Sequence, residues 1–295
     1  MRGNLKTDMK TASGAIVQRV MKLAGDLGER VLSGVVPASD AVAQAHGLRE
    51  KAHRPWPPPD FPWLQGQSWY DLLFAHWPVK ADALRAVVPS QLPLDTYAGS
   101  AWIGITAFEI RGLRLRGAPP LPLIARFPET NVRTYTTLQG APGIYFLSLD
   151  AASTLAVLGA RVSYHLPYAR ARMSIARSGD EVRYRSRRIR SDASLEVIYQ
   201  PHGHVFQAAP GTLEHFLIER YCLYTLAGGD RIHRADIHHP PWQIRKATAD
   251  LRLNTMAAVH GIALPDQAPL LHFSARQHVV IWPLQELQDS HPDTV

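Results

Sequence analysis

The sequence of 295 residues contains a single cysteine, Cys222. One cysteine cannot form an intrachain disulfide or supply the several thiolates of a structural zinc site, so disulfide-stabilised domains and zinc-thiolate modules are excluded. No base stands near Cys222 in the sequence to activate it as a nucleophile, and a lone cysteine is usually a small buried apolar side chain. This cysteine usage suits a reducing compartment, and we expect a cytoplasmic protein.

Lysine is also scarce, because only six of the 32 basic residues are Lys. Of these six, Lys80 and Lys246 are the two that lie beyond residue 54. The net charge of +7 allows a partner made of nucleic acid or anionic membrane. The alternative is a set of arginines dispersed over the surface that pair locally with acids. We adopt this more ordinary alternative, and no nucleic-acid partner is expected.

Long apolar runs are missing as well. No stretch approaches the roughly 20 apolar residues of a membrane-spanning helix, so no membrane span is expected. The first residues lack the apolar core and the cleavage site of a secretory signal. The chain also lacks the glycine-rich loops that bind phosphates and dinucleotides, and it lacks the Gly-x-Ser-x-Gly turn of serine hydrolases. No cofactor is expected.

Residues 1–53 are predicted to form a helical extension. Apolar residues recur there at steps of three and four, as on one face of a helix: Ile16, Val20, Leu23, Leu27 and Val31. A second short helix is expected at 39–51. The proline-rich strap that follows, residues 54–63, is stiff because each proline fixes φ. The main domain is expected over 54–288, and a disordered tail over 289–295.

The main domain has the pattern of a β protein. Many short apolar segments, separated by Gly and Pro turns, predict strands over most of residues 69–282, which is typical of a barrel or a sandwich. Short helices are expected at 80–88, 153–158, 212–220 and 253–259. These elements predict an α+β fold that is mainly antiparallel β-structure with short peripheral helices.

Polar residues alternate along one predicted strand. Glu129, Asn131, Arg133 and Tyr135 recur at every second position, so they lie on one face of the strand. An acid, an amide, a guanidinium and a phenol in register can bind a small molecule, and Arg can hold a carboxylate with two hydrogen bonds. The alternative is a buried ion pair that fixes the strand register. The sequence does not separate these two interpretations.

Several other polar residues have an ordinary structural explanation beside a functional one. Asp150 is expected to cap the helix at 153–158, and Arg161 is expected just after that helix, where a cation is favoured. His76 ends a strand and can act as an acid or a base, or it can be a core histidine bonded to the backbone. Histidines at positions 202, 204, 233, 238 and 239 have no carboxylate placed to complete a metal site, so no metal is expected.

Arginines also alternate at positions 183, 185 and 187, with Tyr184 and Ser186 between them. Basic residues interleaved with an aromatic are found on nucleic-acid-binding faces. No zinc finger, helix-turn-helix or paired-aromatic pattern accompanies them. A solvent-facing strand with charges that protect its edge is the favoured interpretation.

A set of ordered motifs resembles the YqjF-like family of uncharacterised bacterial proteins. The resemblance covers about residues 54–284 and rests on residues 74–79 (FAHWPV), 94–99 (LDTYAG), 101–102 (AW), 127–135 (FPETNVRTY), 145–150 (YFLSLD), 166–168 (LPY) and 239–242 (HPPW). It implies the acetoacetate decarboxylase-like fold, an antiparallel β-barrel with a central cavity. Residues 1–53 lie outside the resemblance.

The resemblance also implies particular site residues. Decarboxylases of that superfamily carry a glutamate on a central strand, which Glu129 resembles, and a Gly-Arg-Glu followed by Gly-x-Pro-Lys-Lys, to which residues 160–162 and 166–169 are similar. Arg161 is kept, but Tyr168 and Ala169 stand where the Schiff-base lysine would be. The covalent mechanism needs a desolvated amine. Schiff-base decarboxylation is therefore not expected.

Two hypotheses follow from these residues. The first is a lyase or proton-transfer enzyme for a substrate that bears a carboxylate or an enolate, with Glu129, Arg161 and Tyr168 as catalytic residues. The second is a non-catalytic protein that binds a small molecule in the same cavity, and a homo-oligomer is left open in both. The expected substrate-binding residues in either case are His76, Trp77, Asn131, Arg133, Tyr135 and Tyr145.

Overall fold

The computed structural model describes residues 38–120, 124–228 and 230–287. The helix expected within residues 16–31 and the tail expected from residue 289 lie outside these ranges. The described residues form a sheet of twelve strands with short helices around it. None of the helices in these ranges is long and apolar enough to cross a membrane.

The strands are β1 (Gln65–Val79), β2 (Ala101–Leu115), β3 (Arg126–Leu138), β4 (Ala141–Ala151), β5 (Tyr168–Ser178), β6 (Glu181–Arg188), β7 (Ser194–Phe206), β8 (Cys222–Ala227), β9 (Arg231–His238), β10 (Ile244–Asn254), β11 (Leu270–Ile281) and β12 (Gln285–Glu286). The helices are α2 (Ala38–Gly47), α3 (Ala81–Arg85), α4 (Thr154–Tyr164), α5 (Leu213–Ile218) and the 3-10 turn η1 (Ala258–His260).

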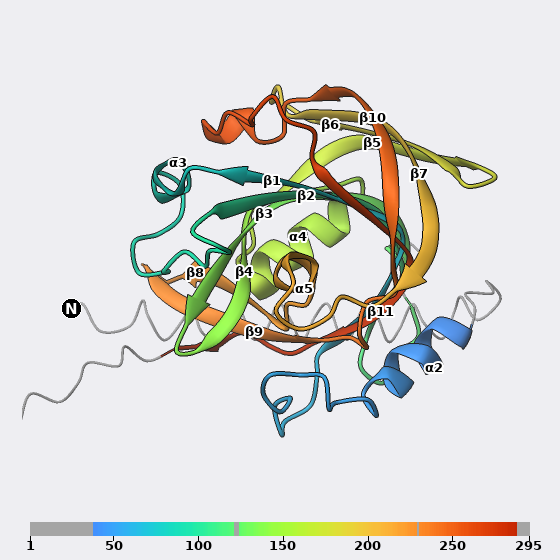
Figure 1. Cartoon of the computed structure of the whole chain (residues 1–295). Helices are drawn as coiled ribbons and strands as arrows, with labels where there is room; N and C mark the ends of the chain where they lie inside the picture. Colours follow the sequence, from blue (N-terminus) through green and yellow to red (C-terminus); the bar gives the residue numbers. More distant parts are fainter. Residues whose placement is uncertain (1–37, 121–123, 229, 288–295) are drawn as a thin grey trace, which may run out of the picture.

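The strands are hydrogen-bonded in the order β12-β9-β8-β4-β3-β2-β1-β11-β10-β7-β6-β5. Two further pairings, β4 with β5 and β9 with β11, join strands that are distant in this order, so the sheet closes on itself. All pairings are antiparallel except those of β4 with β5 and with β8. The expectation of a mainly antiparallel sheet with short helices is confirmed. In Figure 1 the strands run around α4 and α5, which lie within their outline.

The central strands β1 to β4 bury both of their faces. One face packs into a core that includes Leu73, Ile105 and Val132. The opposite face packs into a second core that includes Phe74 and Tyr135, together with residues of α4 and α5. Side chains of successive strand residues point to opposite faces, so polar residues at every second position of β3 all enter the second core.

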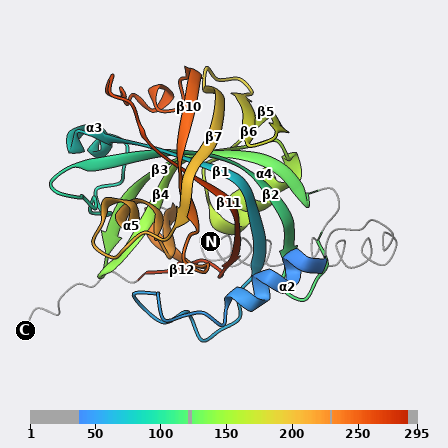
Figure 2. The same ribbon diagram turned by 45° about the vertical axis from the view of Figure 1, so that its right-hand side comes forward.

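Helix α2 and the strap pack on the outside of the sheet, as the turned view in Figure 2 also shows for α2. The Tyr70 hydroxyl donates to Asp40 at 2.7 Å, and the Gln44 amide donates to Ser68 at 3.1 Å. Arg54 of the strap pairs with Asp236 at 3.2 Å, and the Trp282 indole donates to the Phe61 carbonyl at 2.8 Å. The described part of the expected extension therefore contacts the main domain directly.

Two predictions about the strands are wrong. The helix expected at 253–259 is in fact the end of β10, where Leu253 pairs with Glu196 of β7, followed by η1. Residues 112–122 are rich in Gly and Pro, which predicts a loop, but strand β2 continues as far as Leu115. Gly112 has a φ of 61°, a left-handed conformation that suits glycine and lets the strand bend and continue.

Candidate functional site

The polar residues predicted to share one face of β3 do share it, and this face lies inside the molecule. Glu129, Asn131, Arg133 and Tyr135 are all at most 6% exposed. Neighbouring strands extend this face sideways by register, because Thr106 pairs with Asn131, and Gly104 pairs with Arg133 on one side and with His76 on the other. We call these residues together the interior row: Glu129, Asn131, Arg133 and Tyr135 of β3, with His76, Gly104 and Thr106.

Glu129 is buried at one end of the interior row. Its carboxyl accepts a hydrogen bond from the Tyr168 hydroxyl at 2.9 Å, and the Asn131 side chain bonds to it as well. Burial raises the pKa of Glu129 to about 8, although both hydrogen bonds act to lower it. At neutral pH this group is therefore mostly a neutral acid that can exchange a proton near physiological pH.

Arg133 is a buried cation without an acidic partner. No carboxylate among the described residues forms an ion pair with it, Glu129 included, so the two do not make the ion pair that the sequence left open. One nitrogen, Nη2, donates to the Leu217 carbonyl at 3.3 Å, the Tyr135 side chain also bonds to it, and Nε has no hydrogen-bond partner in the described chain. The guanidinium lies 5.2 Å from the Phe74 ring centre. A buried charge without a counter-ion is costly.

His76 of β1 is fully buried, and it lies two strands away from Arg133, because both residues pair in register with Gly104 of β2. Neither of its ring nitrogens has a hydrogen-bond partner among the described residues. Burial first, and then the charge of Arg133, lower its pKa well below the usual value, so the ring is neutral at physiological pH. A neutral imidazole carries one donor and one acceptor, and both are unused here.

Gly104 separates His76 from Arg133. A Cβ added to Gly104 would stand 2.9 Å from Cδ2 of His76 and 3.3 Å from Cγ of Arg133. Real Cβ atoms are essentially never closer than 3.0 Å to such neighbours. Both side chains therefore occupy the space that any other residue at position 104 would need.

Helix α5 covers the Tyr135 end of the row. The Tyr135 hydroxyl donates to the Leu217 carbonyl at 2.9 Å, beside the bond from Arg133. Arg220, just after α5, stacks 4.9 Å from the Tyr135 ring centre and pairs with Asp95 at 2.6 Å. This second buried arginine has a carboxylate partner and so differs from Arg133.

Sequence reasoning missed some members of the site. Thr106 donates to the Asn131 carbonyl oxygen at 2.6 Å, and Gly104 is the residue that admits His76 and Arg133. His272 of β11 pairs in register with Phe74 and is also buried, with Nδ1 unpartnered among the described atoms. Only the strand pairing connects these residues to the row, and a single sequence gives no direct signal for that pairing.

Three predicted site residues lie away from the interior row. Trp77 points to the opposite face of β1 and is buried in the first core, as expected for the neighbour of His76. Tyr145 is partly buried against that same core. Arg161 lies in the last turn of α4, not after it, and it is exposed, with Nε donating to the Tyr168 carbonyl at 2.6 Å.

Asp150 does not cap a helix, so that prediction is wrong. Ser153 caps α4 by accepting a hydrogen bond from the Ala156 amide at 3.3 Å. Asp150 is fully buried and pairs with Arg188 of β6 at 2.7 Å. Burial raises its pKa to about 6 even though Arg188 acts in the opposite direction. Strand β4 continues to Ala151, so Asp150 still lies in the sheet.

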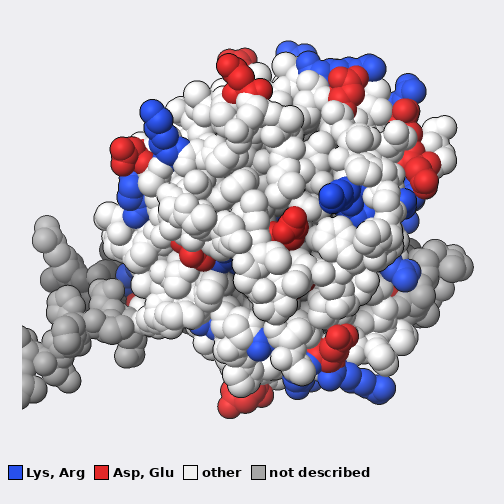
Figure 3. All heavy atoms as spheres, in the orientation of Figure 1, with Lys and Arg blue, Asp and Glu red and all other residues white. Residues whose placement is uncertain are grey.

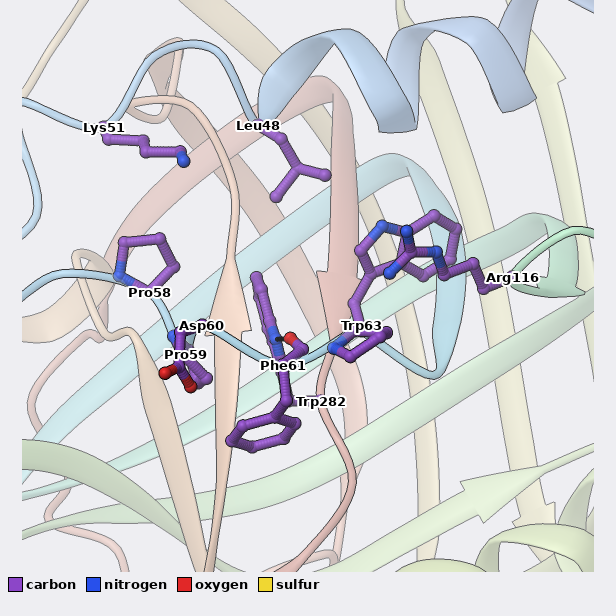
Figure 4. A pocket seen from close by; sticks show the side chains of 10 residues that line it. Leu48, Lys51, Pro58, Pro59, Asp60, Phe61, Trp63, Arg116 and Trp282 are labelled. Carbon is purple, nitrogen blue, oxygen red and sulfur yellow. Dashed lines mark hydrogen bonds between the residues drawn. The ribbon is translucent and has the colours of Figure 1, made fainter.

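Two surface hollows lie far from this row, at the strap. The larger, of about 290 Å³, is drawn in Figure 4, where Lys51 extends toward it from above and Phe61 and Trp282 lie below. The other, of about 270 Å³, is lined by Phe61 and two prolines of the strap, by Arg234 and Asp236 of β9, and by Gln285 and Leu287. Neither hollow includes a residue of the interior row.

The charges on the surface are mixed. On the face drawn in Figure 3, basic and acidic side chains are interspersed and do not form one block. Within the described part of the chain, no group of three or more His, Cys, Asp or Glu side chains is placed to hold a metal ion. Arg183 and Arg185 are exposed and pair with Glu181 and Glu196.

Known sequences match most of the chain. The family model DUF2071, described as an uncharacterized conserved protein, matches residues 66–278. A protein of Bacillus subtilis (strain 168) named uncharacterized protein YqjF is 47% identical over 229 residues, which are 77% of this chain and 94% of that protein.

Solved structures match the fold at low sequence identity. The enduracididine biosynthesis enzyme MppR with HEPES bound has a TM-score of 0.56 at 11% identity, over 80% of this chain and 90% of its own. The acetoacetate decarboxylase of Legionella pneumophila has a TM-score of 0.54 at 11% identity, over 88% of this chain and 98% of its own. MppR complexed with pyruvate has a TM-score of 0.54 at 11% identity, over 81% and 94% of the two chains.

Proposed function

The chain belongs to the DUF2071 family, with YqjF of Bacillus subtilis as a relative and an acetoacetate decarboxylase-like fold, and we propose that its interior row binds a small molecule that bears a carboxylate. In this proposal the ring of strands is the wall of a barrel, and the row lies inside it. Arg133 and His76 hold the carboxylate. The observation that carries the proposal is the buried Arg133 guanidinium without an acidic partner among the described residues.

The side chains of Arg133 and His76, on either side of Gly104, can bind a carboxylate. Arg133 supplies the charge and an unused Nε–H donor, and neutral His76 supplies a second donor from the next strand but one. A bound carboxylate would neutralise a charge that is otherwise uncompensated in a site closed to water. One of the fold neighbours is a complex with pyruvate, a small carboxylate, which agrees with this ligand class.

The length of the row sets the size of the ligand. Glu129 and Arg133 are four positions apart on the strand, or about 13 Å between their Cα atoms. Pyruvate can occupy the Arg133 and His76 end alone. A molecule that also touches Glu129 must be longer, with its carboxylate at Arg133 and its reactive or polar group near Asn131 and Glu129. We therefore favour an elongated oxo acid over pyruvate itself.

The binding proposal is tested by thermal unfolding with pyruvate, 4-oxopentanoate and phenylpyruvate. A ligand at 100 times its dissociation constant adds about 2.7 kcal/mol to the free energy of unfolding. We expect a rise in Tm for at least one longer acid, lost in Arg133→Met and kept in Arg161→Met, because Arg161 is exposed. Equal shifts in both variants, or none in the unmodified protein, would reject Arg133 as the anion site.

A second candidate function, proton transfer, is favoured by the pair of Glu129 and Tyr168. A carboxyl with a pKa of about 8 exchanges protons near neutral pH, and its ionised form can remove a proton from carbon next to a carbonyl. The test is the exchange of such protons for deuterium in D2O, followed by NMR on whichever acid binds. Glu129→Gln should abolish the exchange while the Tm shift remains. Exchange that is unchanged in Glu129→Gln would exclude a catalytic role for Glu129, and only the binding proposal would remain.

A further inference from the structure

The outer face of α4 is apolar and exposed. Leu155, Leu158 and Val162 are 55%, 54% and 46% exposed, and they lie on the side of the helix opposite its buried residues, such as Val157. These three positions follow the three- and four-residue steps of one helical stripe. The first turn of α4 has no acidic residue, and none occurs elsewhere in the helix.

Unpaired arginines lie beside this stripe. Arg161 of α4 donates to the Tyr168 carbonyl at 2.6 Å, which fixes the helix against the start of β5. Arg170 and Arg172 follow Tyr168 at every second position of β5, so they share its face of the strand. Arg187 pairs in register with Arg172, and exposed Ile189 donates its amide to the Arg170 carbonyl.

These arginines lack counter-ions. Of the exposed arginines on β6, Arg183 and Arg185 pair with glutamates, but Arg187 forms no ion pair with any described residue, and neither do Arg170 and Arg172. Like charges directly opposite one another on a sheet, as at Arg172 and Arg187, destabilise it. An anionic surface brought against this face would relieve that repulsion.

We propose that this α4 patch, made of Leu155, Leu158, Val162 and Ile189 with Arg170, Arg172 and Arg187, docks on an anionic phospholipid surface. The arginines contact lipid phosphates, and the leucines and valine enter the boundary between headgroups and acyl chains. Charge complementarity selects an anionic occupant. The exposed aliphatic stripe distinguishes a lipid surface from a nucleic acid, which offers nothing to cover it.

The shape of the patch favours a membrane over an acidic protein. Protein interfaces concentrate their binding energy in aromatic or arginine anchors that fill pockets. The exposed apolar residues of the α4 patch are all aliphatic, and neither surface hollow at the strap includes any of them. An exposed aliphatic stripe without aromatic anchors suits a soft, flat surface better than a fitted partner.

The test is sedimentation of the full chain with vesicles of phosphatidylcholine, alone or mixed with phosphatidylglycerol. We expect binding to the mixed vesicles at low salt, little to phosphatidylcholine alone, and release at high salt. Arg172→Gln combined with Arg187→Gln should weaken binding roughly tenfold or more, because each arginine near the surface contributes substantially. Leu158→Ser should weaken it several-fold.

Two control variants test whether binding depends on the α4 patch itself. Arg183→Gln combined with Arg185→Gln changes the same number of arginines on the same face of β6, but these are ion-paired, and it should change binding little. Leu253→Ser removes a leucine of similar exposure, 45%, on β10, outside the patch. No binding to the mixed vesicles, equal losses in the control variants, or binding that ignores Leu158→Ser would overturn the proposal. Capture of an acidic protein without any vesicle binding would do the same.

Discussion

The strap and the interior row each bury an arginine, but the two arginines differ in the acceptors and counter-ions around them. Arg54 of the strap donates to the Ile237 carbonyl at 2.5 Å and the Trp56 carbonyl at 3.1 Å, and it pairs with Asp236 at 3.2 Å. Arg133 of the row has one backbone acceptor at 3.3 Å, no carboxylate among the described residues and an unused Nε. The first arrangement is complete without a ligand. The second leaves a charge without a carboxylate partner and a donor without an acceptor among the described residues.

This difference separates a structural charge from one available for function. Both guanidiniums lie near aromatic rings, Arg54 at 5.0 Å from Tyr221 and Arg133 at 5.2 Å from Phe74. Packing against rings is therefore common to both and does not distinguish them. The supply of acceptors does distinguish them, and so the comparison can be tested by removing each charge in turn.

The largest expected effect is on stability, from Arg54→Met compared with Arg133→Met. Removing Arg54 leaves the buried Ile237 carbonyl and the partly buried Trp56 carbonyl without this donor and weakens the contact of the strap with Asp236. The loss should cost about 3 kcal/mol or more in the free energy of unfolding. Removing Arg133 deletes an uncompensated charge, so its variant should stay within about 1 kcal/mol of the unmodified protein or exceed it. Urea unfolding at neutral pH measures both.

One outcome of the unfolding experiment would contradict this comparison of Arg54 with Arg133. Similar losses in the two variants would mean that Arg133 is as well satisfied as Arg54, and the argument for an anion site would fall. Circular dichroism of both variants before unfolding checks that each is folded.

The next effect concerns the space between Arg133 and His76. Gly104→Ala should cost about 2 kcal/mol, because its Cβ would stand 2.9 Å from His76 and force the ring to move. The same variant should lose any stabilisation by an oxo acid. Thermal unfolding with and without the acid measures both quantities.

Gly159→Ala is the matched control for that substitution. Gly159 lies within α4, and a Cβ there would meet nothing within 4 Å, so alanine should stabilise the helix by about 0.5 to 1 kcal/mol. If Gly104→Ala were neutral and bound the ligand normally, His76 would not be part of the site.

Much of this arrangement was predictable from local patterns. The alternation of Glu129, Asn131, Arg133 and Tyr135 correctly predicted one shared face, because side-chain direction in a strand depends only on position. The same rule places Trp77 opposite His76, and grouping the two was inconsistent with it. The sequence could not show that Gly104, Thr106 and His272 lie beside this face, since their positions depend on the register between strands that are distant in the chain.

The roles of the charged residues also depend on distant contacts. Asp150 has the sequence position of a helix cap, yet Arg188, which is 38 residues away, determines its role. Arg161 has a position that resembles the arginine of the decarboxylase motif, but the turn of α4 that carries it leaves it exposed at the Tyr168 carbonyl. Whether a buried charge is paired is a long-range property, which is why Arg133 could not be distinguished in advance.

The smallest effect is a pH dependence that belongs to Glu129. Its pKa rises from the ordinary 4.5 to about 8 in the folded protein, so between these values the folded state holds a proton that the unfolded state has lost. The contribution of Glu129 to the free energy of unfolding must then fall as pH rises through this window. From pH 6.5 to 8 we expect this contribution to fall by about 1.5 kcal/mol, since each unit is worth at most about 1.4 kcal/mol.

Glu129→Gln removes this contribution, because the amide imitates the neutral acid and does not titrate. The stability change from pH 6.5 to pH 8 is therefore compared between the two proteins, since the other titrating groups are common to both: Asp150, whose pKa is raised to about 6, acts with the same sign as Glu129, and the buried histidines, whose pKa values are lowered, act with the opposite sign. Urea unfolding at the two pH values should show that this change is about 1.5 kcal/mol less favourable in the unmodified protein than in Glu129→Gln. An equal change in the two proteins would mean that the pKa of Glu129 is not raised in the folded protein.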